Sequence, residues 1–171
     1  RALKDKPREF TYEFVWLDGE EAFCKGWDDC GKPGSPDNTY GSRYYVQAAQ
    51  KAGVTKTLRA NILVDMIGAR NLKLERETRS TRWLTDIVWA TAKRLGHGAV
   101  FQDKQSEVED DHFAFLEAGI ASTDIIDLMD YPYWHNQTCC DDLTQVEEHS
   151  LKIVGDVIVA SVPDVEKYLL K

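Results

Sequence analysis

The feature that most constrains this fold is the alternation of apolar, strand-like runs with segments of helical periodicity. Candidate strands lie at residues 10–17, 59–66, 99–102 and 121–127. Between and after these runs, apolar residues recur at helical spacing, and glycines end several of the helix-like segments. Strands that alternate with helices predict an α/β fold with a mixed, largely parallel central sheet flanked by helices. A chain of 171 residues is the length of one domain, which we assign to residues 1–171.

The first candidate strand and the loop after it stand out. Residues 10–17 are apolar almost throughout, which predicts a central strand covered on both faces. Residues 24–40 are rich in Gly and Pro and predict a long irregular loop. A loop of this length inside a compact domain is usually functional or mobile.

Local signals predict where the later helices begin and end. Ser80 or Thr81 is expected to cap one helix, and Asp111 the next. Thr144–Glu147 has the pattern of a capping box, which predicts the start of another helix. Pro163 is expected to end that helix before a short tail helix.

The charge and hydropathy of the chain exclude two classes of partner. The formal net charge is −8, and no basic cluster interrupts it, which argues against a nucleic-acid surface or an anionic membrane. No apolar run approaches the ~20 residues of a membrane span.

The cysteines leave more than one interpretation open. Cys24 and Cys30 are close enough in sequence to close a small disulfide loop, and the even cysteine count suits an oxidising compartment. Reduced thiols in loops fit equally well. Zinc on these cysteines is less favoured, because no close C-x-x-C pair is present. The pairing of Cys24, Cys30, Cys139 and Cys140 stays open.

Polar residues that could act in catalysis or bind a metal ion follow or flank several candidate strands. They are Glu20-Glu21, Asp65, Asp110 and His135. Because ligands bind outside the carboxyl ends of strands in open α/β sheets, these residues are candidates for one site. Carboxylates and an imidazole suit zinc. The alternatives are an acidic pair on a solvated loop, and carboxylates bonded to neighbouring loop amides.

Several motifs resemble the zinc exopeptidase superfamily, and in order and spacing they are most similar to its glutaminyl cyclase (glutaminyl-peptide cyclotransferase) branch. The motifs are Asp18-Gly19-Glu20-Glu21-Ala22-Phe23, Tyr40-Gly41-Ser42-Arg43, Leu63-Val64-Asp65-Met66-Ile67-Gly68, Asp110-Asp111-His112-Phe113-Ala114-Phe115-Leu116 and Trp134-His135. The likeness runs from about residue 10 to residue 155.

The resemblance implies a role for each matching polar residue. Glu20 matches the general acid/base, and Glu21 and His135 match zinc ligands. Asp110 matches a carboxylate that handles the leaving amide, and Asp65 matches the carboxylate bonded to it. Zinc is therefore the implied cofactor.

Aromatic residues match the substrate pocket of this branch. Trp134 matches the pocket aromatic before the zinc-binding His. Trp27 and Tyr131 resemble further pocket aromatics, each with a one-residue gap in the alignment.

One element of the family pattern is not matched. The resemblance implies a further zinc-binding Asp upstream of the first strand, and residues 1–8 contain no matching motif. We therefore expect this chain to be the carboxyl-terminal portion of a longer protein, without the amino-terminal strands of the fold.

The resemblance implies zinc-dependent cyclisation of amino-terminal glutamine to pyroglutamate, with release of ammonia. Peptide or protein amino termini would then be the partners, and a secreted or periplasmic location is expected. One alternative is a zinc aminopeptidase that removes amino-terminal residues. Another is a non-catalytic domain of the same fold that binds peptide termini, which the unmatched ligand favours.

Overall fold

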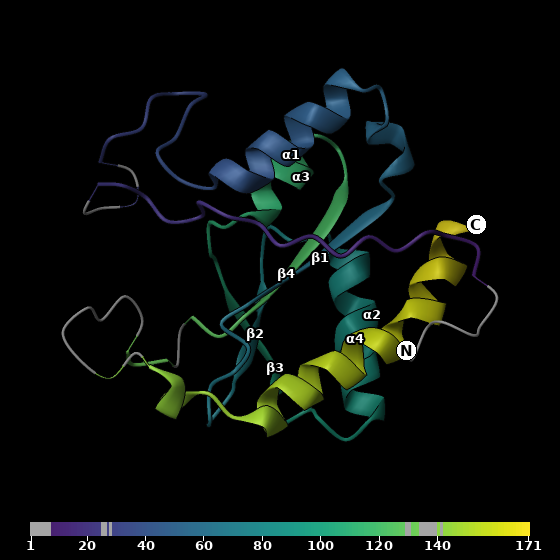
Figure 1. The fold of residues 1–171 in the computed structure, drawn as a ribbon. Helices are drawn as coiled ribbons and strands as arrows, with labels where there is room; N and C mark the ends of the chain where they lie inside the picture. The colour runs from purple at the N-terminus through teal and green to yellow at the C-terminus, as the bar shows by residue number, and fades with distance from the viewer. Residues whose placement is uncertain (1–7, 25–26, 28, 129–130, 134–139, 141) are drawn as a thin grey trace. The chain divides into compact units, whose positions relative to one another are not determined.

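The computed structural model of the chain describes residues 8–24, 27, 29–128, 131–133, 140 and 142–171 (Figure 1). The chain divides into two compact units. The first unit comprises the described residues within 1–11, 64–108 and 123–171, and the second comprises those within 12–63 and 109–122.

Helices and strands alternate along the described chain, except that β2 follows β1 with no helix between them (Figure 1). The helices are α1 (Tyr40–Lys51), α2 (Arg82–Arg94), α3 (His112–Glu117) and α4 (Glu148–Leu169), with short 3-10 turns at Thr55–Thr57 and Leu143–Gln145. The strands are β1 (Ala60–Asp65), β2 (Leu74–Glu77), β3 (Phe101–Ser106) and β4 (Ala121–Ile126). Strand β1 pairs with β4, and β2 pairs in parallel with β3, so the described strands form two two-stranded sheets. The predicted α/β class with parallel strands is confirmed.

In the first unit, α2 packs against α4 (Figure 1). The sequence predicts an inner stripe of Leu84, Val88, Ala92 and Leu95 for this helix. The first three are fully buried, but Leu95 is 39% exposed because the helix ends at Arg94, so the prediction is wrong there. Near the far end of α4, the rings of Tyr168 and Trp83 stack with centroids 4.0 Å apart. Burial of several large apolar side chains contributes on the order of 1.5–3 kcal/mol each, so this core holds the unit together.

In the second unit, α1 packs against α3 (Figure 1). Its core is a small cluster of buried side chains, namely Val46, Ala114, Phe115 and Ile120. Gly41-Ser42 predicts the start of a helix and Gly119 the end of another. Helix α1 indeed begins at Tyr40, and α3 ends just before Gly119, which has φ +77°. This core is small, so other contacts must help to order the long loop before α1.

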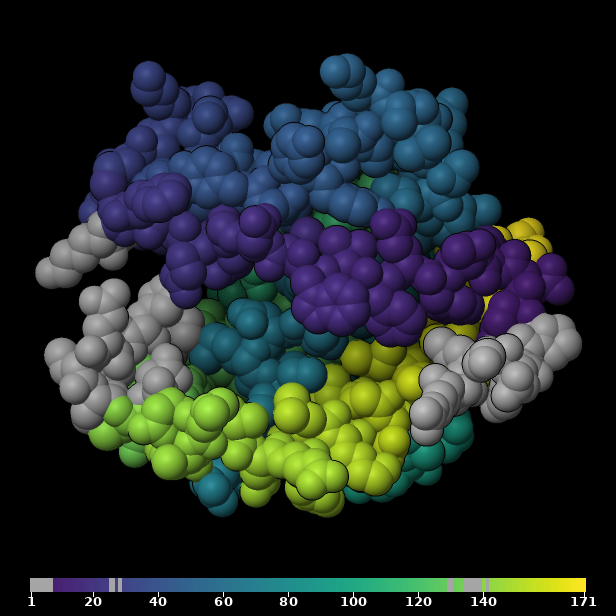
Figure 2. All heavy atoms as spheres, in the orientation of Figure 1, coloured from purple at the N-terminus to yellow at the C-terminus, as the bar shows by residue number. Residues whose placement is uncertain are grey.

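The prediction of a buried strand at residues 10–17 is wrong. These residues form no strand, and the side chains of Phe14 and Trp16 are 72% and 88% exposed. Figure 2 shows this segment, in purple, on the surface of the face in view. An apolar run becomes a strand only when a neighbouring strand pairs with its backbone groups. Within the described residues no strand pairs with this segment.

Strand β2 was not expected, because its sequence reads as polar and charged. Leu74 is fully buried and Glu77 is 3% exposed, so its two ends face the interior. Its register places Leu74 opposite Phe101 of β3. The buried ends and the pairing to β3 override the low strand propensity of the charged residues between them.

The starts of α2 and α3 follow the predictions, but their side-chain caps do not. Thr81 and Asp111 occupy the positions before α2 and α3, and neither side chain makes a capping hydrogen bond. The predicted capping box is also wrong, because Thr144 lies in a 3-10 turn and α4 begins at Glu148. There the Thr144 amide donates to Asp142 Oδ1 at 2.8 Å.

Helix α4 continues through Pro163 to Leu169, so the predicted end at Pro163 and the separate tail helix are wrong. Proline removes one backbone hydrogen bond from a helix interior. Val162 and Val165, on either side of Pro163, are buried, and their burial offsets that loss. No helix in the described part of the chain combines the length and hydropathy that crossing a bilayer requires.

Candidate active site

The candidate catalytic glutamates lie where the extended amino-terminal segment meets α1. Amides at the start of α1 donate to three successive carbonyl oxygens of that segment: Thr39 to Glu20 at 2.7 Å, Tyr40 to Gly19 at 2.8 Å and Gly41 to Asp18 at 2.9 Å. The first amides of a helix have no partner inside the helix. Here they fix the backbone of the glutamate pair directly to α1.

The two adjacent glutamates sit in different environments. Glu20 is half-buried and Glu21 is exposed. Gly19, with φ +61°, adopts a left-handed backbone conformation just before them. The two side chains therefore differ in exposure, and the division into a proton-handling Glu20 and a metal-binding Glu21 stays a prediction.

Asp110 is buried in the second unit, at 3% exposure, just before α3. Its Oδ1 accepts a hydrogen bond from the amide of Asp111, and its carbonyl oxygen accepts one from Phe113 at 2.9 Å. Asp111 and His112 beside it are buried as well. A buried carboxylate is costly without compensating partners, and such groups gather at functional sites.

Asp65 ends β1, as predicted, and is half-buried. Its Oδ1 accepts the amide of Met66 at 2.8 Å. This is the carboxylate-to-loop-amide arrangement that the sequence left open as an alternative.

Two side-chain-bearing residues beside the candidate site have left-handed backbone. Thr39, whose amide bonds Glu20, has φ 48°, and Met66, whose amide bonds Asp65, has φ 50°. Such conformations cost on the order of 1–3 kcal/mol each and persist where the surroundings determine them. The backbone amide of Thr39 donates to Glu20, and that of Met66 donates to Asp65, so each strained residue bonds a predicted site residue.

The predicted site residues divide between the two units. Glu20, Glu21, Trp27 and Asp110 belong to the second unit, whereas Asp65 and Tyr131 belong to the first. Trp134 and His135 lie outside the described residues. The pairing of Glu21 with His135 on one zinc ion therefore stays a prediction.

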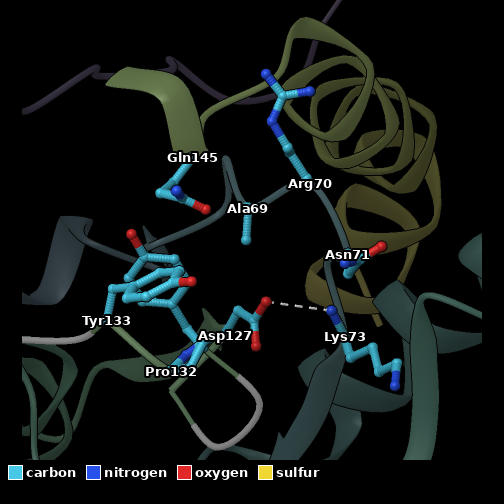
Figure 3. Close-up of a pocket in the computed structure, with 9 residues that line it drawn as sticks. Ala69, Arg70, Asn71, Lys73, Asp127, Pro132, Tyr133 and Gln145 are labelled. Atoms are coloured by element: carbon cyan, nitrogen blue, oxygen red, sulfur yellow. Dashed lines mark hydrogen bonds between the residues drawn. The ribbon is translucent and has the colours of Figure 1, made fainter. Parts of the chain in front are cut away.

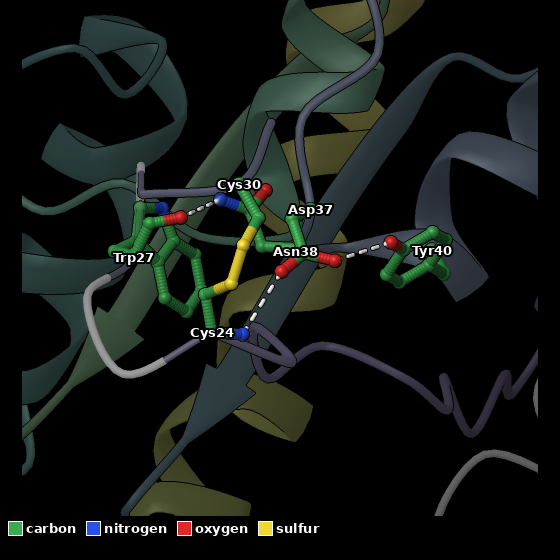
Figure 4. Close-up of a disulfide and its surroundings, with 6 residues drawn as sticks. All are labelled: Cys24, Trp27, Cys30, Asp37, Asn38 and Tyr40. Carbon is green, nitrogen blue, oxygen red and sulfur yellow. Dashed lines mark hydrogen bonds between the residues drawn. A yellow bond between two sulfur atoms is a disulfide. The ribbon is translucent and has the colours of Figure 1, made fainter. Parts of the chain in front are cut away.

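The described residues bring together one group of three metal-ligand side chains, Cys24, Cys30 and Asp37. Cys24 and Cys30 form a disulfide, with Cα atoms 5.9 Å apart, so their sulfur atoms are not available as thiolate ligands (Figure 4). Of the predicted zinc ligands, Glu21 is exposed and offers the carboxylate oxygen that suits zinc. The chemistry of the predicted donor set, a carboxylate and an imidazole, fits the metal.

Trp27 lies inside the disulfide-closed segment (Figure 4). Its carbonyl oxygen accepts the side-chain amide of Asn38 at 3.3 Å. Its indole Nε1 is buried and has no hydrogen-bond acceptor within the described residues. Buried donors are usually paired, so this N–H is suited to a ligand oxygen.

A cavity of about 460 Å³ lies in the first unit (Figure 3). Its lining comprises Ala69, Arg70, Asn71, Lys73, Asp127, Tyr131, Pro132, Tyr133 and Gln145. Tyr131 was predicted as a pocket aromatic, and it lines this cavity. Asp127 was not predicted, although a carboxylate at the end of an apolar strand was the same signal that identified Asp65.

Asp127 is 1% exposed at the floor of that cavity. Its Oδ2 accepts the amide of Lys73 at 3.3 Å (Figure 3). The cavity combines tyrosine rings with this carboxylate and with polar side chains from the loop after β1. Such a mixture is typical of a site that binds a polar ligand.

The sequence over residues 1–162 matches peptidase family M28. This chain belongs to peptidase family M28. The resemblance to zinc exopeptidases and to their glutaminyl cyclase branch is confirmed by the similar proteins.

Two solved structures illustrate the likeness of this M28 chain. A glutaminyl cyclase from an Acidobacteriales bacterium is 32% identical with a TM-score of 0.77, covering 90% of this chain and 52% of that one. A leucine aminopeptidase precursor from Bacteroides thetaiotaomicron is 27% identical with a TM-score of 0.74, covering 86% of this chain and 51% of that one.

Curated relatives of this M28 chain include the glutaminyl-peptide cyclotransferase-like proteins of Mus musculus and Bos taurus, each 28% identical. The matches cover 78% and 77% of this chain, and 38% and 37% of the relatives. The chain thus spans less than two fifths of these curated relatives and about half of the solved structures.

Proposed function

We propose that this M28 chain belongs to a glutaminyl-peptide cyclotransferase, which cyclises an amino-terminal glutamine to pyroglutamate and releases ammonia. The observation that carries the proposal is the backbone-fixed pair of glutamates, with Glu20 half-buried beside an exposed Glu21. Relatives whose names state this activity support it.

Glu20 would accept a proton from the α-amine of the substrate and deliver it to the departing ammonia. The attack is intramolecular, so holding the glutamine side chain against its own amine supplies much of the rate. Asp110 would hold the leaving amide, and its burial suits a carboxylate that exchanges a proton with Asp65.

Zinc is the proposed cofactor, held by Glu21 and His135. When bound, it would polarise the γ-carbonyl of the glutamine. The predicted donor set, a carboxylate and an imidazole, supports this choice of metal.

The substrates would be peptide or protein amino termini, which Trp27, Tyr131 and Trp134 would contact. A secreted or periplasmic location is part of the proposal. The Cys24–Cys30 disulfide supports it, because disulfides persist in oxidising compartments.

The alternative is a zinc aminopeptidase, and the similarity to a leucine aminopeptidase precursor favours it. Aminopeptidases of the superfamily are expected to carry Ser at the position of Asp110 and often Tyr at that of Trp134. This chain has Asp and Trp at these positions, which favours the cyclase.

The test compares two activities of the full-length protein. A peptide with amino-terminal glutamine is assayed for ammonia release, and leucine peptides are assayed for free leucine, each with and without a chelator. We expect ammonia release alone, lost with the chelator and restored by zinc. Release of leucine with two tightly bound zinc ions per chain would favour the aminopeptidase, and silence in both assays would favour the non-catalytic binding domain.

The Glu20→Gln variant separates chemistry from metal binding. It keeps the size of the side chain and loses the proton acceptor, so turnover should fall by a factor of about 10²–10⁴. Zinc content, measured on the same samples, should stay near that of the unmodified protein. Retained turnover would exclude Glu20 as the acid/base.

A further inference from the structure

We propose that Asp37 is a positioning residue for substrate binding. Its carboxylate clamps the disulfide-closed segment that carries Trp27 onto the first turn of α1. The inference rests on the proposed function for its kinetic readout. The clamp itself is tested separately below.

Asp37 joins two parts of the chain through its two carboxylate oxygens (Figure 4). Oδ2 accepts the backbone amide of Cys24 at 3.0 Å. Oδ1 accepts the hydroxyl of Tyr40 at 2.7 Å. Asp37 is 9% exposed and Tyr40 is 40% exposed, so these bonds are partly shielded from water. One buried side chain thereby ties the start of the disulfide loop to the start of α1.

The carboxylate is held in its charged form. The Tyr40 hydroxyl and then the Cys24 amide lower the pKa of Asp37 below its ordinary value. The same contact raises the pKa of Tyr40. Hydrogen bonds to an ionised carboxylate are stronger than those between neutral groups.

The backbone on either side of Asp37 is also fixed. The guanidinium of Arg43 donates to the carbonyl oxygen of Pro36 at 2.9 Å and to that of Asn38 at 2.8 and 3.1 Å. The Arg43 guanidinium lies 4.9 Å from the centre of the Tyr40 ring. Asp37 is thus presented by a rigid support, as a positioning residue requires.

The disulfide links the hydrogen bonds of Asp37 to the segment that contains Trp27. The Cys24–Cys30 bond closes a short loop around Trp27, and Asp37 grips the Cys24 end of that loop. The buried indole N–H of Trp27 lacks an acceptor within the described residues, which suits a substrate oxygen. Loss of the clamp should therefore weaken substrate binding and leave proton transfer at Glu20 nearly intact.

The kinetic test uses the full-length protein and a peptide with amino-terminal glutamine. Asp37→Ala should raise KM about tenfold, the equivalent of one lost charge-assisted hydrogen bond, with kcat nearly unchanged. Asp37→Asn, which keeps one acceptor oxygen, should recover part of the loss. Asp156→Asn removes an exposed carboxylate of α4 and should change neither constant. A fall in kcat at constant KM, or an unchanged KM, would overturn the inference.

A second test needs no activity and so separates the clamp from the proposed function. We measure how fast dithiothreitol reduces the Cys24–Cys30 disulfide in the unmodified protein, Asp37→Ala and Tyr40→Phe. Both variants should be reduced faster, because the clamped loop shields and orders the disulfide. Tyr40→Phe removes a single hydrogen bond and serves if Asp37→Ala fails to fold. Equal reduction rates would contradict the clamp even if the enzyme is active.

A combined variant tests whether Asp37 and the Cys24–Cys30 disulfide act together. If Asp37 acts through the disulfide loop, replacing both cysteines by serine should remove most of the effect of Asp37→Ala on KM. Additive effects of the two changes would show that Asp37 acts elsewhere.

Discussion

At the residue scale, Gly41 sets how closely α1 approaches the candidate catalytic glutamates. A Cβ atom at this position would overlap the backbone of Asp18, lying 2.8 Å from its nitrogen and closer still to its carbonyl oxygen. Those atoms belong to the backbone and cannot rotate away. Gly41 therefore permits the three hydrogen bonds that fix the glutamate pair.

We predict that Gly41→Ala destabilises the protein by about 1–3 kcal/mol, because the overlap forces the two backbones apart. Urea unfolding measures the change. Gly155→Ala is the matched control, since no atom lies within 4 Å of its added Cβ and the residue is inside α4. That control should gain about 0.5–1 kcal/mol. A loss at Gly41 no larger than about 0.5 kcal/mol would show that the contact is not tight.

Glu77 carries a second residue-scale prediction. Its carboxylate accepts the amides of Arg79 and Ser80 at 2.9 and 2.6 Å, and the Ser80 hydroxyl at 2.8 Å. Glu77→Gln keeps a single acceptor oxygen and loses the charge, so we expect a loss of about 1.5–3 kcal/mol in the free energy of unfolding. Glu107→Gln changes an exposed residue of the same unit and should be nearly neutral.

At the scale of elements, Tyr45 links α1 to the extended segment before the glutamates. Its hydroxyl donates to Glu13 Oε2 at 2.8 Å. Burial, followed by this hydrogen bond and the charge of Glu13, raises the pKa of Tyr45 to about 12. The raised pKa favours the neutral phenol in the folded state.

We therefore predict a loss of stability at high pH. The pKa of Tyr45 is higher in the folded protein, at about 12, than in the unfolded chain, at about 10. Its contribution to the free energy of unfolding is therefore complete below about pH 10 and is lost as the pH rises toward 12. Urea midpoints measured across this window should fall for the unmodified protein and fall less for Tyr45→Phe. Tyr44→Phe, at a 75% exposed neighbour, should retain the full decline. Parallel curves for all three would contradict the assignment.

Sequence patterns predicted those elements whose signal is local. The stripe of Leu84, Val88, Ala92 and Leu95 identifies α2, because helical periodicity depends on that helix alone, although Leu95 lies past the helix end and is exposed. The sequence pattern predicts a strand at residues 10–17, where there is none, and no strand at β2, because strand formation depends on a partner elsewhere in the chain. Pro163 was misjudged because packing around it outweighed a local rule.

Local sequence signals also identify some of the site residues, but not all of them. Glu20 and Asp65 follow apolar runs, and that pattern marks them without any structure. Asp37 lies in an irregular loop without periodicity, so its two hydrogen bonds could not be foreseen. Asp127 also ends an apolar run, so the pattern that marks Asp65 marks this residue as well.

At the scale of the whole molecule, the two units differ in how they are stabilised. Among the described residues, the buried apolar side chains of the second unit are Val46, Ala114, Phe115 and Ile120, and all the others belong to the first unit. The second unit adds the Cys24–Cys30 disulfide and the bonds of Asp37. Its order depends more on cross-links and polar contacts than on apolar burial.

This difference predicts unequal protection in native-state hydrogen exchange. Amides of α2 and the middle of α4 should exchange most slowly, because opening them exposes the larger core, whereas those of α1 and α3 should exchange faster. Replacing Cys24 and Cys30 by serine should speed exchange in α1 further and leave α2 unchanged, since this disulfide lies in the second unit. Equal protection in α1, α2, α3 and α4, or an effect of the two substitutions on α2, would mean that the two units open as one.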